Sequence, residues 1–299
     1  MHVVDLRSVD VRAQSFYADL YLWVRFNSAG LDEARLQAVQ TLEPVNGKFD
    51  SKEVIDEKQV GDEKYVCWRV TGTFFFVADL KKYPFDTQVL PLTLEAASLE
   101  ADEVVLVDDR GSYAKGGTPE ARWGLSPTLT IPDYALLGVE RRTWAAEYPT
   151  NFGDPTKQKA ATHYARYSLL TKFEREYWSY AFKILVPLLV ILAMAYLVFF
   201  LPASQLDTSA SIAITALLSC MAYNVAVSQS MPEIGYLVLS DKFFIGTYVL
   251  LLLTLLEEIW TFVLDGRGAT ELALRIDRWS RVLFPLMVAG LFGLFLASV

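Results

Sequence analysis

Four long stretches in the second half of the chain set the strongest limit on its fold. Three are rich in aliphatic and aromatic residues: Trp178–Leu201, Phe243–Leu264 and Val282–Val299. Each has about the ~18–25 residues that a helix needs to cross the ~30 Å hydrocarbon layer of a bilayer. A fourth stretch, Asp207–Gln229, is equally long but carries an acid, hydroxyls and amides at regular intervals. We therefore expect four transmembrane helices, at about 177–201, 205–229, 240–264 and 279–298.

The first half of the chain has the pattern of a water-exposed β-domain. Of the 35 acidic residues, 26 lie in residues 1–174. In Phe16–Phe26 apolar and polar residues alternate, as in a strand with one buried face. Similar runs recur between Gly, Pro and Asp clusters, and the only helix-like piece is Leu31–Leu42. Many short strands without βαβ spacing predict an all-β, immunoglobulin-like sandwich.

The chain thus divides into an extracytoplasmic β-domain, residues 1–175, and an all-α membrane domain, residues 176–299. Orientation follows from positive charge, which marks short cytoplasmic loops. The loop expected between the third and fourth helices holds Arg267, Arg275, Arg278 and Arg281, whereas the 230–242 loop has only Lys242. Four spans then put both termini outside the cell (inner) membrane. No signal peptide precedes the first strand-like segment, which suggests a mature chain or part of a longer one.

Several functional classes lack support in the sequence. No basic run predicts nucleic-acid binding, and no catalytic set or phosphate-binding loop predicts an enzyme or a cofactor. Cys67 and Cys220 fall in different halves, so they predict neither a disulfide framework nor a metal site. No metal is assigned, but acidic pairs such as Asp108 and Asp109 are candidates for modulation by divalent cations. Solvated loop charge is the other interpretation of these pairs.

The helix at 207–229 carries one continuous stripe. Its residues are spaced by 4, 4, 3, 4, 3 and 4 positions, so they share one helix face. A polar stripe in a bilayer faces water or protein. Hydrogen bonding between helices is one interpretation, and a water-filled path is the other. An unbroken register of this length favours the path, and one helix cannot surround it, so several copies are expected. The candidate pore-lining residues are Asp207, Ser211, Thr215, Leu218, Ala222, Val225 and Gln229.

Three of these residues have specific predicted roles. Rings of carboxylates and of large apolar side chains are common as ion filters and as gates that stop ions by dewetting. We expect Asp207 to set cation selectivity, and Leu218 and Val225 to form the gate.

Short motifs elsewhere resemble one family. The segment YPFDTQ (Tyr83–Gln88) resembles the core of the Cys-loop in pentameric ligand-gated ion channels, and Ser8–Phe16 resembles their β1–β2 loop. Phe173–Tyr180 is similar to the junction of their last strand with the first helix, and Asn224–Pro232 to the end of their pore helix. The motifs follow the family order across nearly the whole chain. The flanking cysteines would fall at Phe76 and Leu90, so the disulfide is absent, as in the bacterial branch.

The resemblance implies a gating interface at the membrane-facing end of the sandwich. Asp86 would pair with Arg175 at the exit of the last strand, with capping of a surface turn as the alternative for Asp86. The implied interface residues are Asp10, Tyr83, Pro84, Phe85, Asp86, Arg175, Pro232 and Tyr236.

The family's agonist site is often an aromatic box that holds a cation. The candidates here are Trp23, Trp68, Tyr148, Phe152 and Tyr164, with ordinary packing as the alternative for each. The family's Trp-x-Pro-Asp stretch is missing, which implies that one wall of the usual site is rebuilt.

The leading hypothesis is a homopentameric, cation-selective ligand-gated channel. Its expected partners are copies of itself, lipids, permeant cations and an unknown extracellular ligand, proton or divalent cation. The alternative is a membrane-anchored β-sandwich receptor that binds without conducting.

Overall fold

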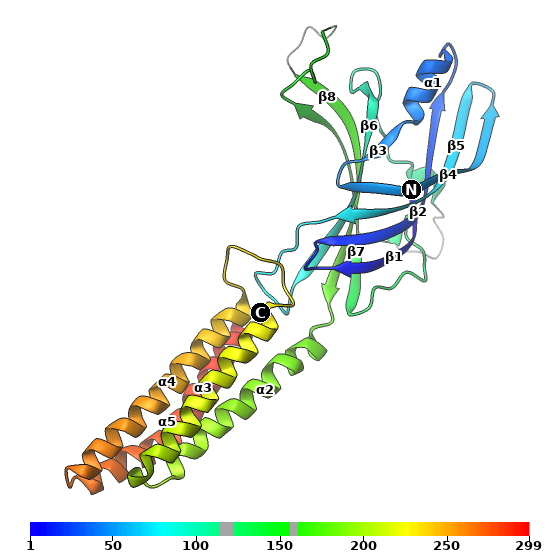
Figure 1. The fold of residues 1–299 in the computed structure, drawn as a ribbon. Helices are drawn as coiled ribbons and strands as arrows, with labels where there is room; N and C mark the ends of the chain where they lie inside the picture. Colours follow the sequence, from blue (N-terminus) through cyan, green and yellow to red (C-terminus); the bar gives the residue numbers. More distant parts are fainter. Residues whose placement is uncertain (114–121, 156–160, 299) are drawn as a thin grey trace. The chain divides into compact units, whose positions relative to one another are not determined.

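The computed structural model describes residues 1–113, 122–155 and 161–298. The chain forms two compact units (Figure 1). Unit 1 comprises Met1–Ala78 and Thr87–Arg175, and unit 2 comprises Asp79–Asp86 and Glu176–Val299. The segment Asp79–Asp86 therefore groups with the helices, which a single boundary at residue 175 does not anticipate.

Unit 1 consists of two four-stranded sheets in which all paired strands are antiparallel. The first sheet has the order β1–β2–β5–β4 and the second β3–β6–β8–β7. A short helix, α1, precedes β3 and begins at the N-cap Asp32, whose carboxylate accepts from the Arg35 amide. The strands are β1 (His2–Asp10), β2 (Ser15–Asn27), β3 (Leu42–Pro44), β4 (Gly47–Val60), β5 (Glu63–Phe75), β6 (Thr87–Glu100), β7 (Tyr134–Tyr148) and β8 (Thr162–Arg175), with α1 at Glu33–Gln40 and a 3₁₀ turn at Arg110–Ser112.

The core of unit 1 follows from strand alternation. In β2 the apolar residues Phe16, Ala18, Leu20 and Leu22 are buried, while the residues that alternate with them are more exposed. In the second sheet β6 buries Leu90 and Leu92 in the same alternating way. Each sheet thus has one apolar face, and two such faces pack as a sandwich. The predicted fold class, an all-β sandwich followed by an all-α four-helix bundle, is confirmed.

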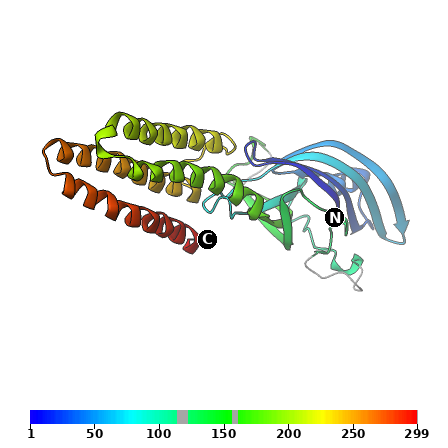
Figure 2. The same cartoon turned by 90° about the horizontal axis from the view of Figure 1, so that it is seen from below.

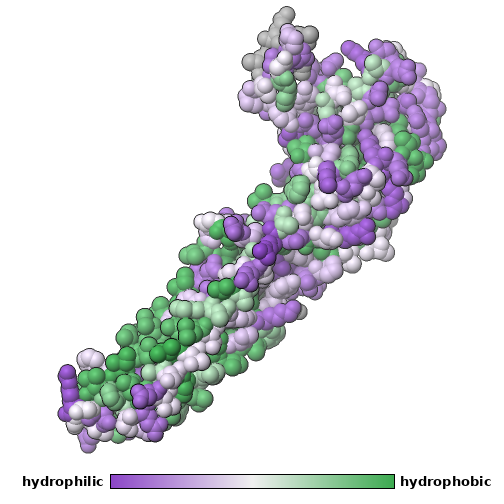
Figure 3. Space-filling model, in the orientation of Figure 1, coloured by the Kyte–Doolittle hydropathy of each residue, from purple (hydrophilic) through white to green (hydrophobic). Residues whose placement is uncertain are grey.

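Unit 2 contains four helices that are long and apolar enough to cross a membrane within the described residues. They run side by side, with α3 against α2 and α4, and α4 against α5 (Figure 2). Large apolar side chains are exposed on their surface, as in Leu256 and Leu286, which suits contact with lipid (Figure 3). Their bounds are α2 (Tyr177–Leu197), α3 (Leu206–Ser228), α4 (Leu239–Gly266) and α5 (Thr270–Ala297), with 3₁₀ turns at Val198–Phe200 and Ala203–Gln205.

The last helix begins well before the expected residue 279. Gly268 has φ of 80°, a conformation that glycine tolerates and that commonly ends a helix, and α5 starts at Thr270. The first turns of α5 carry charged residues, so hydropathy alone does not reveal them. Arg275, Arg278 and Arg281 therefore lie on α5 rather than in a loop. They remain near the helix end, where positive charge still bears on orientation.

Candidate functional site

The stripe of α3 is the face that the rest of unit 2 leaves open. The buried residues of α3 are Ser209, Ala213, Ala216 and Cys220. By contrast, all seven stripe residues are exposed, and Leu218 and Val225 are 60% and 57% exposed. The polar stripe is therefore not used for helix packing within the chain.

The hydroxyls of the stripe bond to their own helix. Ser211 Oγ donates to the Asp207 carbonyl at 2.6 Å, and Thr215 Oγ1 donates to the Ser211 carbonyl at 2.7 Å. Each hydroxyl oxygen keeps lone pairs on the open face, because a hydroxyl has one donor and two acceptor sites. The face can therefore accept hydrogen bonds from water or contact a cation.

Asp207 lies in the first turn of α3 but is not its N-cap. The N-cap is Gln205, and the Asp207 carboxylate accepts no hydrogen bond within the described residues. The helix dipole still favours an acid at this end. Capping by its side chain is therefore not the role that this carboxylate has in the chain, and it is exposed.

The segment Asp79–Asp86 is attached to unit 2 by several contacts. The Leu80 amide donates to the Tyr236 hydroxyl at 3.1 Å, and the Leu239 amide donates to the Lys81 carbonyl at 3.1 Å. The Lys81 ammonium lies 6.0 Å from the centre of the Tyr236 ring. The segment is thus linked to the connection between α3 and α4.

Phe85 anchors the same segment on the other helices. Its ring lies 5.0 Å from that of Tyr177 on α2 and 5.8 Å from that of Phe295 on α5. Tyr83 and Pro232 are buried, and Pro84 follows Tyr83 in a turn. Six of the eight expected interface residues therefore belong to unit 2: Tyr83, Pro84, Phe85, Asp86, Pro232 and Tyr236.

The two remaining interface candidates belong to unit 1. Asp10 ends β1 and accepts a hydrogen bond from the Ala13 amide at 2.9 Å. Arg175 ends β8, where its guanidinium lies 4.8 Å from the ring centre of Tyr134. The pairing of Asp86 with Arg175 joins the two units and stays a prediction.

Three of the five candidate ligand residues form a cluster at the β7–β8 hairpin. The ring centre of Tyr148 lies 5.3 Å from that of Phe152 and 5.8 Å from that of Tyr164. The ring centres of Phe152 and Tyr164 are 6.2 Å apart. Phe152 is 59% exposed, so the cluster is open on one side. Residues 156–160 of this hairpin lie outside the described residues.

A charged pair underlies that cluster. Arg166 Nε donates to Glu95 at 2.6 Å, and the Tyr148 hydroxyl also contacts both partners. The Arg166 guanidinium lies 5.4 Å from the centre of the Tyr148 ring. Burial and Glu95 raise the pKa of Tyr148, against the opposing effect of Arg166. The aromatic cluster therefore already has one cation against it, the guanidinium of Arg166.

The two tryptophan candidates lie elsewhere, on the first sheet. Trp68 is buried, and Lys52 Nζ lies 4.6 Å from the centre of its ring. Burial lowers the pKa of Lys52, against the effect of Glu43. Trp23 donates its indole N–H to Asp109 at 2.9 Å. The structure thus does not bring the five aromatic candidates into one site.

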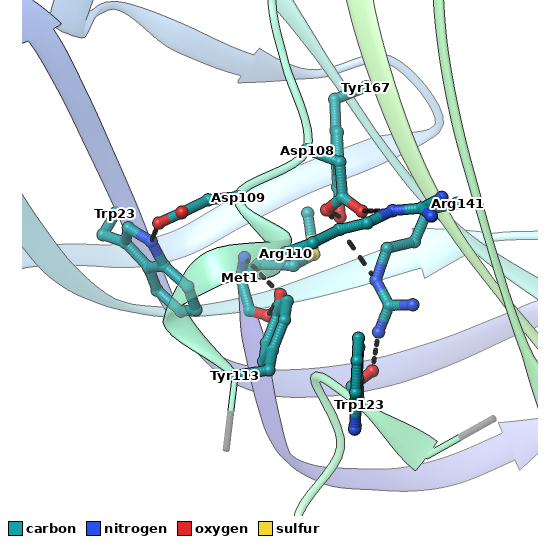
Figure 4. A network of polar contacts seen from close by, with 9 residues as sticks. All are labelled: Met1, Trp23, Asp108, Asp109, Arg110, Tyr113, Trp123, Arg141 and Tyr167. Carbon is teal, nitrogen blue, oxygen red and sulfur yellow. Dashed lines mark hydrogen bonds and ion pairs between the residues drawn. The ribbon is translucent and has the colours of Figure 1, made fainter. Parts of the chain in front are cut away.

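The acidic pair Asp108 and Asp109 is engaged by donors of the same chain (Figure 4). Asp108 accepts from Tyr167 at 3.1 Å and from Arg110 at 3.1 Å, while Arg141 lies 3.8 Å away. No group of three or more His, Cys, Asp or Glu in the described part of the chain is arranged to hold a metal ion.

Asp109 is held in a similar way. It accepts from Trp23, from Arg25 at 2.7 Å and from Ser112 at 2.6 Å. Burial alone would raise the pKa of Asp109. The hydrogen bonds from Ser112, Trp23 and Arg25 and the charge of Arg25 outweigh burial, so the pKa is lowered. Each carboxylate is therefore paired with an arginine, and modulation of this acidic pair by divalent cations stays a prediction.

One polar cluster in unit 2 escaped the sequence analysis. Glu258 of α4 and Asp277 of α5 are buried, and Glu257 of α4 and Ser209 of α3 lie beside them. The consecutive glutamates in an otherwise apolar helix are the signal that could have revealed it, because acids within spanning helices are costly and usually functional.

Comparison with known proteins agrees with the motif resemblance. A proton-gated ion channel from Gloeobacter violaceus is 21% identical over 96% of this chain and 78% of its own length. The gamma-aminobutyric acid receptor subunit beta-4 of Gallus gallus is 22% identical over 71% of this chain. The pH-sensitive chloride channel 2 of Anopheles gambiae is 24% identical over 60% of it.

The chain spans 40% and 28% of the lengths of the last two relatives. No protein-family model matches the chain. All three relatives are Cys-loop channels rather than enzymes, and the four apolar helices make this a multi-pass membrane protein. The chain is thus similar, at 21–24% identity, to relatives that are Cys-loop pentameric ligand-gated ion channels.

Proposed function

We propose that this chain forms a homopentameric, cation-selective channel whose pore is lined by α3. The observation that carries the proposal is the open stripe of α3, which is polar at both ends and apolar at Leu218 and Val225. An exposed polar face on a membrane helix is costly in lipid and is stable beside water. In an assembly of five copies around an axis, this face of α3 lines a water-filled pore.

The proposed cation selectivity rests on residues of this chain. One relative is named a chloride channel, so kinship does not decide the sign of the permeant ion. Asp207 is exposed and unpaired within the described residues at the start of the stripe. A ring of carboxylates concentrates cations and repels anions over a few ångströms.

We infer that gating begins in unit 1 and that the protein lies in a cell membrane with both termini extracytoplasmic. Protons are the first candidate stimulus, because one relative is named proton-gated and another pH-sensitive. An organic ligand at the Tyr148 cluster is the second candidate, supported by its open aromatic face.

The test is recording from the purified full chain in planar bilayers while external pH is stepped from neutral to acidic. The proposal expects unitary cation currents, with open probability that changes with pH or with an added ligand. The non-conducting receptor, the alternative function, predicts a silent bilayer in every condition although the protein is inserted.

A further inference from the structure

A cavity of about 420 Å³ lies within unit 1 of a single chain. Its walls come from β2, α1, β3, β6 and the segment Val104–Asp109. The volume falls in the ~300–1,000 Å³ range of ligand pockets and far exceeds the water-sized voids of a packed interior. Of the five aromatic candidates above, only Trp23 lines it.

Four of the residues that line the cavity are charged, Arg25, Glu63, Asp108 and Asp109. Most of the others are aliphatic or aromatic and give the cavity apolar surface. The residues that form this surface include Leu22, Val24, Phe26, Val39, Leu42 and Leu106.

The charged side chains at the cavity are paired with one another, and Figure 4 shows the contacts of Asp108 with Arg110 and Arg141. Asp109 is bound by Arg25, which also lies 3.8 Å from Glu63. Asp108 is bound by Arg110 and faces Arg141, which also donates to the Trp123 carbonyl. Three acids thus face three arginines, so the charges of these described side chains balance one another.

One wall is suited to admit a ligand. Within the described chain, Val105–Val107 pairs with no strand, and its neighbours Asp108 and Asp109 are attached through side chains. The segment alternates, with Leu106 half-buried and Val105 and Val107 at 72% and 80% exposure. A wall without a β-ladder can move at lower cost than a paired strand.

We propose that this cavity binds a neutral, mainly apolar small organic molecule. The apolar walls supply the affinity, and the closed set of ion pairs rejects charged compounds, because burying an unpaired charge is costly. The proposal requires only unit 1 and holds whether or not the chain conducts ions.

The probe is 4-fluorotoluene, followed by fluorine NMR on the full chain in detergent. Partition into micelles is not saturable, whereas the proposal expects a saturable bound signal as the probe concentration rises. The anion 4-fluorobenzoate and the cation 4-fluorobenzylammonium should bind at least about tenfold more weakly than the neutral probe.

Two variants fill the cavity and one serves as the matched control. Val39→Trp on α1 and Leu106→Trp on the unpaired wall should abolish the saturable signal. Val54→Trp makes the same kind of change at a 58% exposed position of β4 outside the cavity, and it should bind like the parent. The size-exclusion profile and circular dichroism show which variants fold. If one of the two filling variants does not fold, the binding result of the other tests the proposal. Absence of a saturable signal in the parent, its survival in a folded filling variant, or tighter binding of a charged probe would overturn the proposal.

Discussion

The hydroxyl of Tyr236 accepts a hydrogen bond from the backbone amide of Leu80, with 3.1 Å between oxygen and nitrogen. Leu80 belongs to the segment Asp79–Asp86, and Tyr236 belongs to the connection that follows α3. The contact therefore links a segment that leaves the β-domain directly to the end of the proposed pore helix. A movement of Asp79–Asp86 can therefore be transmitted to α3 through Tyr236, within unit 2.

Removal of this hydroxyl should weaken coupling without changing permeation. Tyr236→Phe leaves the Leu80 amide without its acceptor, at a net cost of roughly 0.5–1.5 kcal/mol. We expect the stimulus needed for half-maximal opening to shift by about two- to tenfold, with unitary conductance unchanged. Dose–response recording measures the shift. Tyr17→Phe is the control, since its hydroxyl has no hydrogen bond within the described residues. Equal behaviour of both variants would show that the contact does not carry gating.

Asp86 and Arg175 give a second test of coupling. A partly buried carboxylate–guanidinium pair fixes geometry more than it adds stability. Asp86→Asn and Arg175→Gln should each impair opening or assembly, and the double variant should be no worse than the more damaging single change. Additive effects in the double-mutant cycle would show that the two residues do not interact.

Periodicity predicted the parts of the protein that depend on local sequence. The stripe spacing identified the face of α3 that is open, and α3 spans Leu206–Ser228, close to the expected 205–229. The alternation in Phe16–Phe26 identified the buried face of β2. In both cases the spacing of residues on one face is set by the local geometry of the helix or strand. The prediction therefore does not depend on residues that are distant in the sequence.

Periodicity did not predict contacts between residues that are far apart in the sequence, nor the start of α5. The early turns of α5 are charged, so the start at Thr270 was missed. Asp109 pairs with Arg25 and Asp108 faces Arg141, and both arginines are far away in the sequence, whereas Arg110, which also binds Asp108, is a neighbour. Likewise Trp23 is on the first sheet and the Tyr148 cluster on the second, a division that strand order decides.

A third prediction concerns the gate. Leu218 is 60% exposed on the open face of α3, and a ring of leucines can exclude water from a narrow pore. Leu218→Ser should stabilise conducting states and raise basal current several-fold at matched surface expression. Leu252→Ser, at a 49% exposed position of α4 outside the stripe, should leave basal current unchanged. Parent-like current in Leu218→Ser would place the gate elsewhere on the stripe, Val225 being the next candidate.

A fourth prediction follows from the lowered pKa of Asp109. Its folded pKa lies below the unfolded value of ~3.9, so its stabilising effect is present above that pH and is lost as pH falls through the folded pKa. Asp109→Asn should lower the melting temperature at pH 7 by about 2–4 °C, and the difference from the parent should shrink below about pH 3. Asp102→Asn, an exposed acid without a hydrogen bond among the described residues, is the control. A deficit that stays the same as pH falls below about 3 would contradict this account.

The reversal potential in asymmetric salt tests the central claim, that the α3 stripe lines a cation-selective pore. Asp207 lies in the first turn of α3 on the open face, and Glu271 in the first turn of α5 outside that face. The account predicts a cation-selective parent, clear loss of that preference in Asp207→Ala, and no change in Glu271→Ala, because only the first acid forms a ring around the pore. An anion-selective parent, or an Asp207→Ala variant with unchanged reversal potential, would contradict it.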